Sequence, residues 1–511
     1  MIDPVFLDGA TLRVADVVAV ARNRAPVALA DGVRERMMRS QAHVARVVEQ
    51  REVVYGVTTG FGKLSDIAIA PDRLADLQVN LVRSHAAGVG PLLPSAETRG
   101  MMLLRANVIA KGYGGARPAL VELLVGMLNA GLHPPVPEQG SVGASGDLAP
   151  LAHLALALIG ESTLTRAADG REGDAREMLA AAGLAPVLLG PKEGLTLING
   201  TQAHTAIATL ALDDAHRLWR VAHAAGAMTL EALLGTPVAF DSRIHDVRGQ
   251  PGQQRSAALL RSLLEGSEIR ESHRSNDPRV QDAYALRCMP QVHGPALEAL
   301  EFAGGIIARE LNAATDNPLV FENGDFVSGG NFHGQAVALA CDVLAIALTN
   351  LATISERRID RLVHPDLNQG LPPFLARDAG LHSGFMMAQV TAAALASECK
   401  QLAHPASVDT IPTDGSKEDV VPMAMGAANK LRRVVQNVRH VLAIELLCGA
   451  QGIDYRRPLR SAPGIENTHA AVRALVPPLG DDRVLAPDIA AIANAIAVGR
   501  FDVAPAAEVV A

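Results

Sequence analysis

The second part of the chain carries apolar residues at the spacing of long helices. From about residue 200 onward, apolar side chains recur at steps of three, four and eight, which places them on one helix face: Ile207, Leu210, Leu218, Val221, Ala225, Met228 and Ala232. The same kind of spacing relates Leu344, Leu348, Leu351 and Ile354, and further long helices are predicted at 386–401 and 423–447. A helix of about thirty residues is about 45 Å long. The pattern therefore predicts several rods packed side by side as a bundle.

The first part of the chain is interrupted by turns instead. Residues 134–137 read Pro-Pro-Val-Pro, which forces an extended backbone, and residues 165–176 are polar and charged, as expected of a surface excursion. We therefore predict two domains, a mixed N-terminal region at 1–198 and a long-helix bundle at 199–511. The predicted fold class is mainly α.

Composition determines what the core of such a bundle can be made of. The chain has 511 residues, of which 49% are apolar and only 3% are aromatic. The core must then be aliphatic and rich in alanine, and small side chains let helices approach closely. The longest apolar stretch, 336–354, contains Asp342, Thr349 and Asn350 and is interpreted as a buried helix, so no membrane partner is expected.

The net charge and the cysteines indicate which kinds of partner and which cellular compartment to expect. The net charge is −8 and no basic stripe is present, so nucleic acid is not an expected partner. The four cysteines are widely spaced and form no Cys-x-x-Cys pair, which favours reduced thiols in a cytoplasmic enzyme and gives no metal site. The N-terminal residues lack the basic and apolar regions of a signal peptide.

Three small residues, Ala144, Ser145 and Gly146, stand between a glycine and an acid in the run Gly-Ser-Val-Gly-Ala-Ser-Gly-Asp at 140–147. Gly146 has no Cβ, so its nitrogen can be pressed toward the carbonyl carbon of Ala144. Attack by that nitrogen, loss of water, and loss of the Ser145 hydroxyl would leave an imidazolone with an exocyclic methylidene. Such a ring is an electrophile, a role that no standard side chain fills.

Three other glycine-containing motifs do not match the spacing of this sequence. A nucleophile elbow needs Gly-x-Ser-x-Gly, but Asp147 stands at the fifth position. A dinucleotide fingerprint needs Gly-x-Gly-x-x-Gly, whereas Gly140, Gly143 and Gly146 are three apart. The Gly-Phe-Gly-Lys at 60–63 lacks the rest of a P-loop. The remaining alternative is a glycine-rich turn into a helix capped by Asp147.

The surroundings of this segment resemble the prosthetic-group signature of the aromatic amino acid ammonia-lyase family. The resemblance runs from Tyr55 to Glu418 and is closest to the branch that acts on histidine. It implies that residues 144–146 form 4-methylidene-imidazol-5-one (MIO) autocatalytically, with no dissociable cofactor. It also implies an aspartase- or fumarase-like helical bundle and a homotetramer whose active sites each draw on three subunits.

An ammonia-lyase needs a base for the weakly acidic β-proton, and Tyr55 is the candidate. It begins the run Tyr-Gly-Val-Thr-Thr-Gly-Phe-Gly at 55–62, which resembles a family motif. The pKa of a phenol near 10 must be lowered for this role, as nearby cations and helix N-termini can do. A tyrosine considered alone would more often be a core residue with a satisfied hydroxyl.

Arg287 is the candidate anchor for the substrate carboxylate, because a guanidinium can hold a carboxylate through two parallel hydrogen bonds. If its segment is helical, Tyr284 shares its face and Gln281 lies one turn back. The resemblance assigns all three to the active site, with Tyr284 in a catalytic role. The alternative is an ordinary solvated arginine on a helix.

Two further positions match the family near the electrophile. The resemblance places Asn199 beside the prosthetic group and the substrate carboxylate, and Phe332 as an aromatic wall. Taken alone, an asparagine before Gly200 is more often a turn residue, and a phenylalanine is more often core packing.

Substrate choice depends on His85 and Glu418, which resemble the side-chain-selecting positions of the histidine branch. A carboxylate and a histidine can hydrogen-bond the two nitrogens of an imidazole, whereas a phenyl ring offers no partner. Met386 is a candidate for the same pocket, although a core methionine is nearly as good an interpretation. The Val-Val-Pro-Met at 420–423 departs from the family, where many members of this branch have a His and a Ser.

The expected activity is a carbon–nitrogen lyase that eliminates ammonia from L-histidine to give trans-urocanate, the first step of histidine breakdown. Within the family, the alternative is a tyrosine or phenylalanine ammonia-lyase or an aminomutase. A fumarase- or argininosuccinase-like lyase shares the bundle, but its Gly-Ser-Ser-type loop is absent. The last alternative is a non-catalytic helical scaffold.

Overall fold

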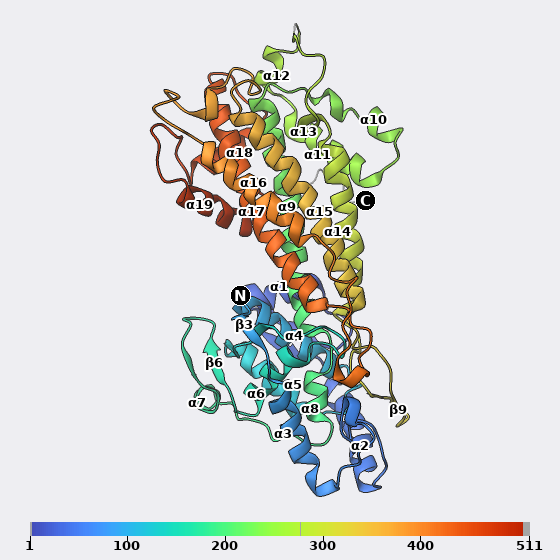
Figure 1. Cartoon of the computed structure of the whole chain (residues 1–511). Helices are drawn as coiled ribbons and strands as arrows, with labels where there is room; N and C mark the ends of the chain where they lie inside the picture. Colours follow the sequence, from blue (N-terminus) through green and yellow to red (C-terminus); the bar gives the residue numbers. More distant parts are fainter. Residues whose placement is uncertain (1–2, 276, 504–511) are drawn as a thin grey trace. The chain divides into compact units, whose positions relative to one another are not determined.

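The computed structural model describes residues 3–275 and 277–503, and most of these residues are helical (Figure 1). The chain divides into two compact units, each built from three segments. Unit 1 comprises Met1–Ala211, Ala303–Asp342 and Pro405–Asn429, and unit 2 comprises Leu212–Phe302, Val343–His404 and Lys430–Ala511. These units are discontinuous in sequence and therefore differ in kind from the two continuous domains predicted at 1–198 and 199–511. The division between 198 and 199 stays a prediction.

One of the five unit boundaries, between His404 and Pro405, lies after α16 (Met386–Leu402), and the other four fall within long helices. These are α9 (Gln202–Ala232), α14 (Met289–Glu310), α15 (Gln335–Val363) and α17 (Ala424–Arg456). At these four boundaries the chain passes from one unit to the other within a continuous helix, coloured from green to orange in Figure 1. Periodicity reveals a helix but gives no sign that its two ends belong to different compact units.

Unit 1 is the mixed α and β region. Its helices are α1 (Val14–Asn23), α2 (Val33–Glu49), α3 (Leu74–His85), α4 (Ser95–Ala110), α5 (Pro118–Asn129), α6 (Leu148–Leu158), α7 (Ala175–Ala181) and α8 (Glu193–Ile198). Its strands are β1 (Val5–Leu7), β2 (Val27–Leu29), β3 (Val89–Leu92), β4 (Leu132–His133), β5 (Pro137–Gln139), β6 (Thr163–Arg166), β7 (Glu172–Asp174), β8 (Leu319–Val320) and β9 (Phe326–Val327). Short 3-10 turns lie at Gly62–Leu64 (η1), Pro71–Arg73 (η2) and Asp414–Ser416 (η5).

Helix α4 is the central element of unit 1. All of its residues from Glu97 to Ala110 are buried, and it packs against α1, α2 and α5. Two sequence predictions are confirmed beside it. The proline run at 134–137 leads from β4 into the first residue of β5, and the polar stretch at 165–176 includes the end of β6 and all of β7, which pair antiparallel.

Unit 2 is the helical bundle that the apolar spacing predicted. Besides its parts of the four long helices, it contains α10 (Ser242–Asp246), α11 (Pro251–Leu264), α12 (Glu268–Ser272), α13 (Tyr284–Arg287), α16 (Met386–Leu402), α18 (Pro463–Arg473) and α19 (Ala486–Ala497), with 3-10 turns at Pro237–Phe240 (η3) and Pro373–Leu375 (η4). The helices predicted at 386–401 and 423–447 correspond to α16 and to most of α17.

Polar contacts tie three rods of this bundle together. The carboxylate of Glu445 on α17 pairs with Arg358 on α15 at 2.5 and 2.8 Å, and both side chains are fully buried. It also accepts hydrogen bonds from Ser355 on α15 and Thr229 on α9. A buried ion pair of this kind is costly to break, because the remaining charge loses its only compensation.

Among the described residues, one helix, α15, is long and apolar enough to cross a membrane by length and composition. Most of its apolar window is buried inside the protein, including Leu344, Leu348 and Leu351, which have no exposed surface. Its apolar character is thus that of a core helix, as predicted from the sequence.

Candidate active site

The Ala144–Gly146 segment lies in unit 1 between β5 and α6, and its backbone shape requires glycine. Gly143 and Gly146 both have a φ of +76°, in the left-handed region. Gly146 lies so close to Gly200 that a Cβ would come within 2.1 Å of the Gly200 carbonyl oxygen. The two glycines form a parallel bridge, and the amide of Asp147 donates to the same oxygen at 2.7 Å. Any side chain at 146 would break this contact.

Asp147 fixes the end of the segment in a way that differs from the helix cap of the alternative interpretation. It precedes α6, but its buried carboxylate makes no capping bond to that helix. It accepts instead from the amides of Ala203 and His204 at the start of α9, from the His204 ring and from Ser141, each at 2.9 Å. The residue after the Ala-Ser-Gly run therefore joins the starts of two helices that are far apart in sequence.

Ser145 is held from two sides. Its hydroxyl donates to the carboxylate of Glu418, and its carbonyl oxygen accepts from Asn199 Nδ2 at 2.9 Å. Asn199 is buried, and its Oδ1 has no hydrogen-bond partner among the described residues. A buried amide oxygen without a hydrogen-bond donor destabilises the protein, because it has lost its bonds to water. This oxygen is therefore available to accept a hydrogen bond from a bound molecule.

Glu418 lies on a loop that is itself fixed. Its second carboxylate oxygen accepts from the Thr413 hydroxyl at 2.5 Å, and the backbones of the two residues form an antiparallel bridge. The carboxylate thus has a defined position beside Ser145, although the two residues are separated by most of the chain.

Two cavities meet at this point, with volumes of about 510 and 520 Å³. Both are lined by Tyr55, Ser145 and Glu418, together with Gly62 and Asp414. One continues along Ala144, Phe332 and His333; the other continues along Asn199, His85 and Leu81. The structure therefore brings together, in one unit, these predicted residues: Tyr55, His85, Ala144, Ser145, Asn199, Phe332 and Glu418.

The protonation pattern of His85 follows from its neighbours. Its Nδ1 lies 2.8 Å from the Leu81 carbonyl oxygen and 3.0 Å from the Ser84 hydroxyl. A carbonyl only accepts, so Nδ1 carries a hydrogen and donates to Leu81. The other ring nitrogen, Nε2, is then the one left for a molecule in the cavity.

The environment of Tyr55 corrects one expectation. Burial raises the pKa of the Tyr55 hydroxyl above its ordinary value of 10.0, and the carboxylates of Asp414, Asp316 and Glu418 raise it further. Only the Gly62 amide, which donates to the hydroxyl at 3.4 Å, lowers this pKa. The cation or helix N-terminus expected to lower it is not among these contributors.

Gln281, Tyr284, Arg287 and Met386 belong to unit 2 and line neither cavity around Ser145. Gln281 precedes the short helix α13, so it does not share a helical face with the other two. The predicted proximity of Tyr284 and Arg287 is present, since the guanidinium carbon lies 4.6 Å from the ring centroid. Gln281 and Arg287 line a separate cavity of about 330 Å³, and Tyr284 is 70% exposed. Their assignment to the active site stays a prediction.

Sequence reasoning missed Asp414, His333 and Asn317, which also line the first cavity. Asp414 accepts from the amide of Lys63 at 3.3 Å and so joins its loop to the segment that follows Tyr55. The only local signal was its place in the run Thr-Asp-Gly-Ser-Lys-Glu at 413–418, which looks like an ordinary turn.

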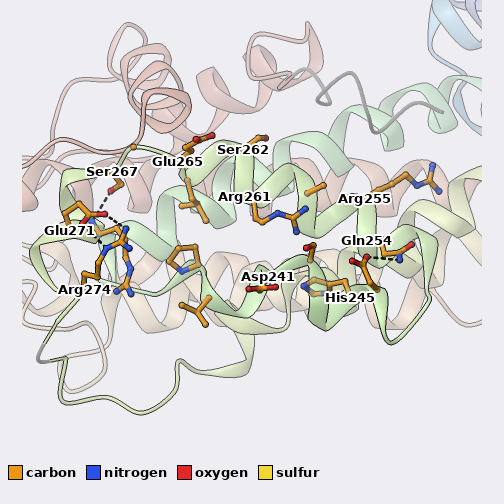
Figure 2. A pocket seen from close by; sticks show the side chains of 18 of the residues that line it. Asp241, His245, Gln254, Arg255, Arg261, Ser262, Glu265, Ser267, Glu271 and Arg274 are labelled. Carbon is orange, nitrogen blue, oxygen red and sulfur yellow. Dashed lines mark hydrogen bonds and ion pairs between the residues drawn. The ribbon is translucent and has the colours of Figure 1, made fainter.

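Unit 2 has a larger hollow, of about 1130 Å³, between η3, α10, α11 and α12 (Figure 2). Its walls carry arginines and carboxylates that pair with one another or with close neighbours. Arg274 pairs with Glu271, and Arg255 pairs with Glu301. It contains none of the residues predicted for catalysis, so the cavities at Ser145 are the better candidate site.

With this geometry in place, comparison with known proteins identifies the family. The model of the aromatic amino acid lyase family matches residues 12–474. The chain belongs to this family. A histidine ammonia-lyase of Anaeromyxobacter dehalogenans is 55% identical over 507 residues, which cover 98% of this chain and 100% of that relative.

Two solved structures of the family illustrate its range. A histidine ammonia-lyase of Trypanosoma cruzi has a TM-score of 0.90 and 43% identity, covering 98% of this chain and 94% of its own. A tyrosine aminomutase of Streptomyces globisporus has a TM-score of 0.91 and 40% identity, covering 98% and 97%. Family and helical-bundle fold are therefore settled, and substrate choice must be argued from the site.

Proposed function

We propose that this chain is a histidine ammonia-lyase, which eliminates ammonia from L-histidine to give trans-urocanate. The observation that carries the proposal is the position of Glu418 and His85 on the walls of two cavities that share Tyr55 and Ser145. Relatives of that name are 51–55% identical over 97–98% of this chain.

We infer that residues 144–146 form the MIO group of this family. A bond between the Gly146 nitrogen and the Ala144 carbonyl carbon closes the ring, and the Ala144 oxygen leaves as water with two amide hydrogens. A second water carries away the Ser145 hydroxyl and the Cα hydrogen. The close approach of Gly146 to Gly200 and the Asn199 hydrogen bond to the Ser145 carbonyl, the oxygen that the ring retains, both support this inference.

Once formed, the group supplies an electrophile that makes the substrate amine a better leaving group. The remaining tasks belong to side chains. The Glu418 carboxylate accepts from one imidazole N–H of the substrate, and Nε2 of His85 accepts from the other ring nitrogen when the substrate imidazole is protonated, so that both of its nitrogens donate. A phenyl side chain offers neither partner and would leave the Glu418 oxygen that is not bound to Thr413 without a hydrogen-bond donor from the substrate. Phe332 forms an apolar wall near Ala144.

We infer that Tyr55 takes the β-proton and that Arg287, with Gln281, binds the substrate carboxylate. Arg287, Gln281, Tyr284 and Met386 lie in unit 2, and Tyr284 is 70% exposed, which suits residues that complete a site in another copy of the chain. Family members are oligomeric, and we propose a homotetramer whose active sites are shared between subunits, with Tyr284 catalytic and Met386 beside the substrate side chain.

We further propose that the enzyme works in the cytoplasm. All four cysteines are free thiols in the structure, and three of them are buried. This agrees with a compartment in which thiols stay reduced.

The deciding experiment incubates the purified enzyme with L-histidine, L-tyrosine or L-phenylalanine and follows near-UV absorbance and released ammonia. We expect urocanate and an equal amount of ammonia from histidine only. A cinnamate-type product or a β-amino acid, as an aminomutase would give, would overturn the histidine assignment. Absence of any product, together with an intact mass that retains both waters, would point to a non-catalytic scaffold.

A further inference from the structure

Arg105, near the C-terminal end of α4, is a buried cation that the reaction itself does not need. Its side chain is 0% exposed, and it lines neither cavity at Ser145. Among the described residues it forms no ion pair with a carboxylate. Burial lowers the pKa of Arg105 to about 10, which still leaves the guanidinium charged at neutral pH. A buried charge of this kind is expensive and is expected to have a specific partner.

The partners of Arg105 are the backbone and side chain around Asn199. One guanidinium nitrogen donates to the Asn199 carbonyl at 2.9 Å and to Gln202 Oε1 at 2.6 Å, and the other donates to the Thr196 carbonyl. The two carbonyls belong to the end of α8, where a helix leaves acceptors without partners and favours a positive charge. Gln202 is fixed in turn by Thr315 at 2.9 Å.

This network extends directly to the Ala-Ser-Gly segment. A Cβ on Gly200 would lie 2.6 Å from the Arg105 Nη1 atom, so the guanidinium packs on the bare backbone of Gly200. Gly200 in turn packs on Gly146, and Asn199 donates to the Ser145 carbonyl. The Arg105 guanidinium therefore contacts both Asn199 and Gly200, the two residues that pack against the Ala-Ser-Gly segment.

We propose that Arg105 is a positioning residue, which holds Asn199 and Gly200 in the arrangement that lets residues 144–146 cyclise and that aligns the Asn199 amide. The proposal rests on the function proposed above and deepens it. Arg105 lines neither cavity at Ser145, so its loss should impair cyclisation and lower kcat while leaving the affinity for substrate unchanged.

Arg99 provides a matched control on the same helix. It is 1% exposed, burial likewise lowers its pKa to about 10, and it donates to the carbonyls of Leu128 and Val20 at 3.1 and 3.0 Å. Within the described part of the chain, its hydrogen bonds reach none of the residues around Ser145. Arg105→Met and Arg99→Met thus remove equally buried guanidinium groups and differ in what those groups hold.

The test compares full-length unsubstituted enzyme, R105M and R99M by intact mass, thermal unfolding, and kcat and KM for histidine. We expect R105M to contain chains that retain both waters, and its kcat per cyclised chain to fall by about 100-fold with little change in KM. We expect R99M to be fully cyclised. Complete cyclisation and normal kcat in R105M would overturn the proposal, and so would equal defects in the two variants.

If R105M does not accumulate as folded protein, Arg105→Lys decides. Lysine keeps the charge, but its single ammonium cannot reproduce the fork that holds two carbonyls and an amide. Folded R105K with complete cyclisation and normal kcat would overturn the proposal; slow or partial cyclisation would support it. Failure of the proposed function is seen separately, because the unsubstituted enzyme itself would then retain both waters or release no ammonia from histidine.

Discussion

Replacing Glu418 with glutamine tests whether this carboxylate selects the imidazole ring. The substitution keeps the shape of the side chain and removes its charge. The position is well defined in the structure, because Thr413 holds one carboxylate oxygen at 2.5 Å and the backbone bridge holds the loop. The effect should therefore come from the lost charge and not from movement of the loop.

The expected magnitude follows from the strength of one hydrogen bond. A hydrogen bond to a charged group contributes about 1.5–3 kcal/mol. At about 1.4 kcal/mol for each factor of ten, E418Q should lower kcat/KM for histidine by about 10- to 150-fold. Inhibition by urocanate should weaken, whereas inhibition by cinnamate should stay the same or improve, because the phenyl ring no longer lies against a charged oxygen to which it can donate no hydrogen bond.

The assay measures kcat/KM for histidine and the inhibition constants of both acids in E418Q and in Asp409→Asn. Asp409 is an exposed carboxylate earlier in the same loop region that lines neither cavity, so D409N controls for loss of one negative charge. An equal change in the two inhibition constants would refute the reasoning, since Glu418 would then act on the part of the substrate that both acids share.

Three further predictions follow from other parts of the structure. Ser145→Ala should fold, as judged by circular dichroism, but lose most activity and release at most the one water of ring closure, because the substituted side chain has no hydroxyl to lose; near-normal turnover would contradict the mechanism. Because the pKa of Tyr55 is raised above 10.0, its phenolate is scarce at neutral pH, so kcat/KM for histidine should climb with pH from about 8 to 10. A plateau below about pH 9 would show that a cation outside the described surroundings lowers this pKa. Glu445→Gln leaves the fully buried Arg358 without its counter-charge, so urea denaturation should show a loss of about 3 kcal/mol in the free energy of unfolding, and an unchanged midpoint would contradict this.

The parts of this protein that sequence alone could predict are those with local causes. Apolar spacing located α9, α15, α16 and α17 because a helix repeats its buried face within each few residues. The Ala-Ser-Gly segment could be interpreted because the freedom of Gly146 is a property of glycine itself. In both cases the information lies within a few residues of the feature.

The parts that sequence missed depend on contacts between distant residues. Asp147 looked like a cap for the helix that follows it, yet its carboxylate binds the start of α9, some fifty-six residues away. Arg105 had no motif at all, and its role depends on the end of α8. The direction of the Tyr55 pKa was unpredictable for the same reason: burial in the folded chain raises it most, and Asp414 and Glu418, on a loop more than three hundred residues later, raise it further.

The proposed electrophile would depend on both kinds of contact. The segment at 144–146 carries its reactive atoms locally, but the groups that shape it come from 199–200 and from 418, at separations of 54 and 273 residues for the two hydrogen bonds to Ser145. Those contacts exist only after unit 1 has assembled from its three segments. On the proposed function, ring closure therefore follows folding, so a variant that slows cyclisation without unfolding the chain should accumulate as a compact protein that still carries both waters.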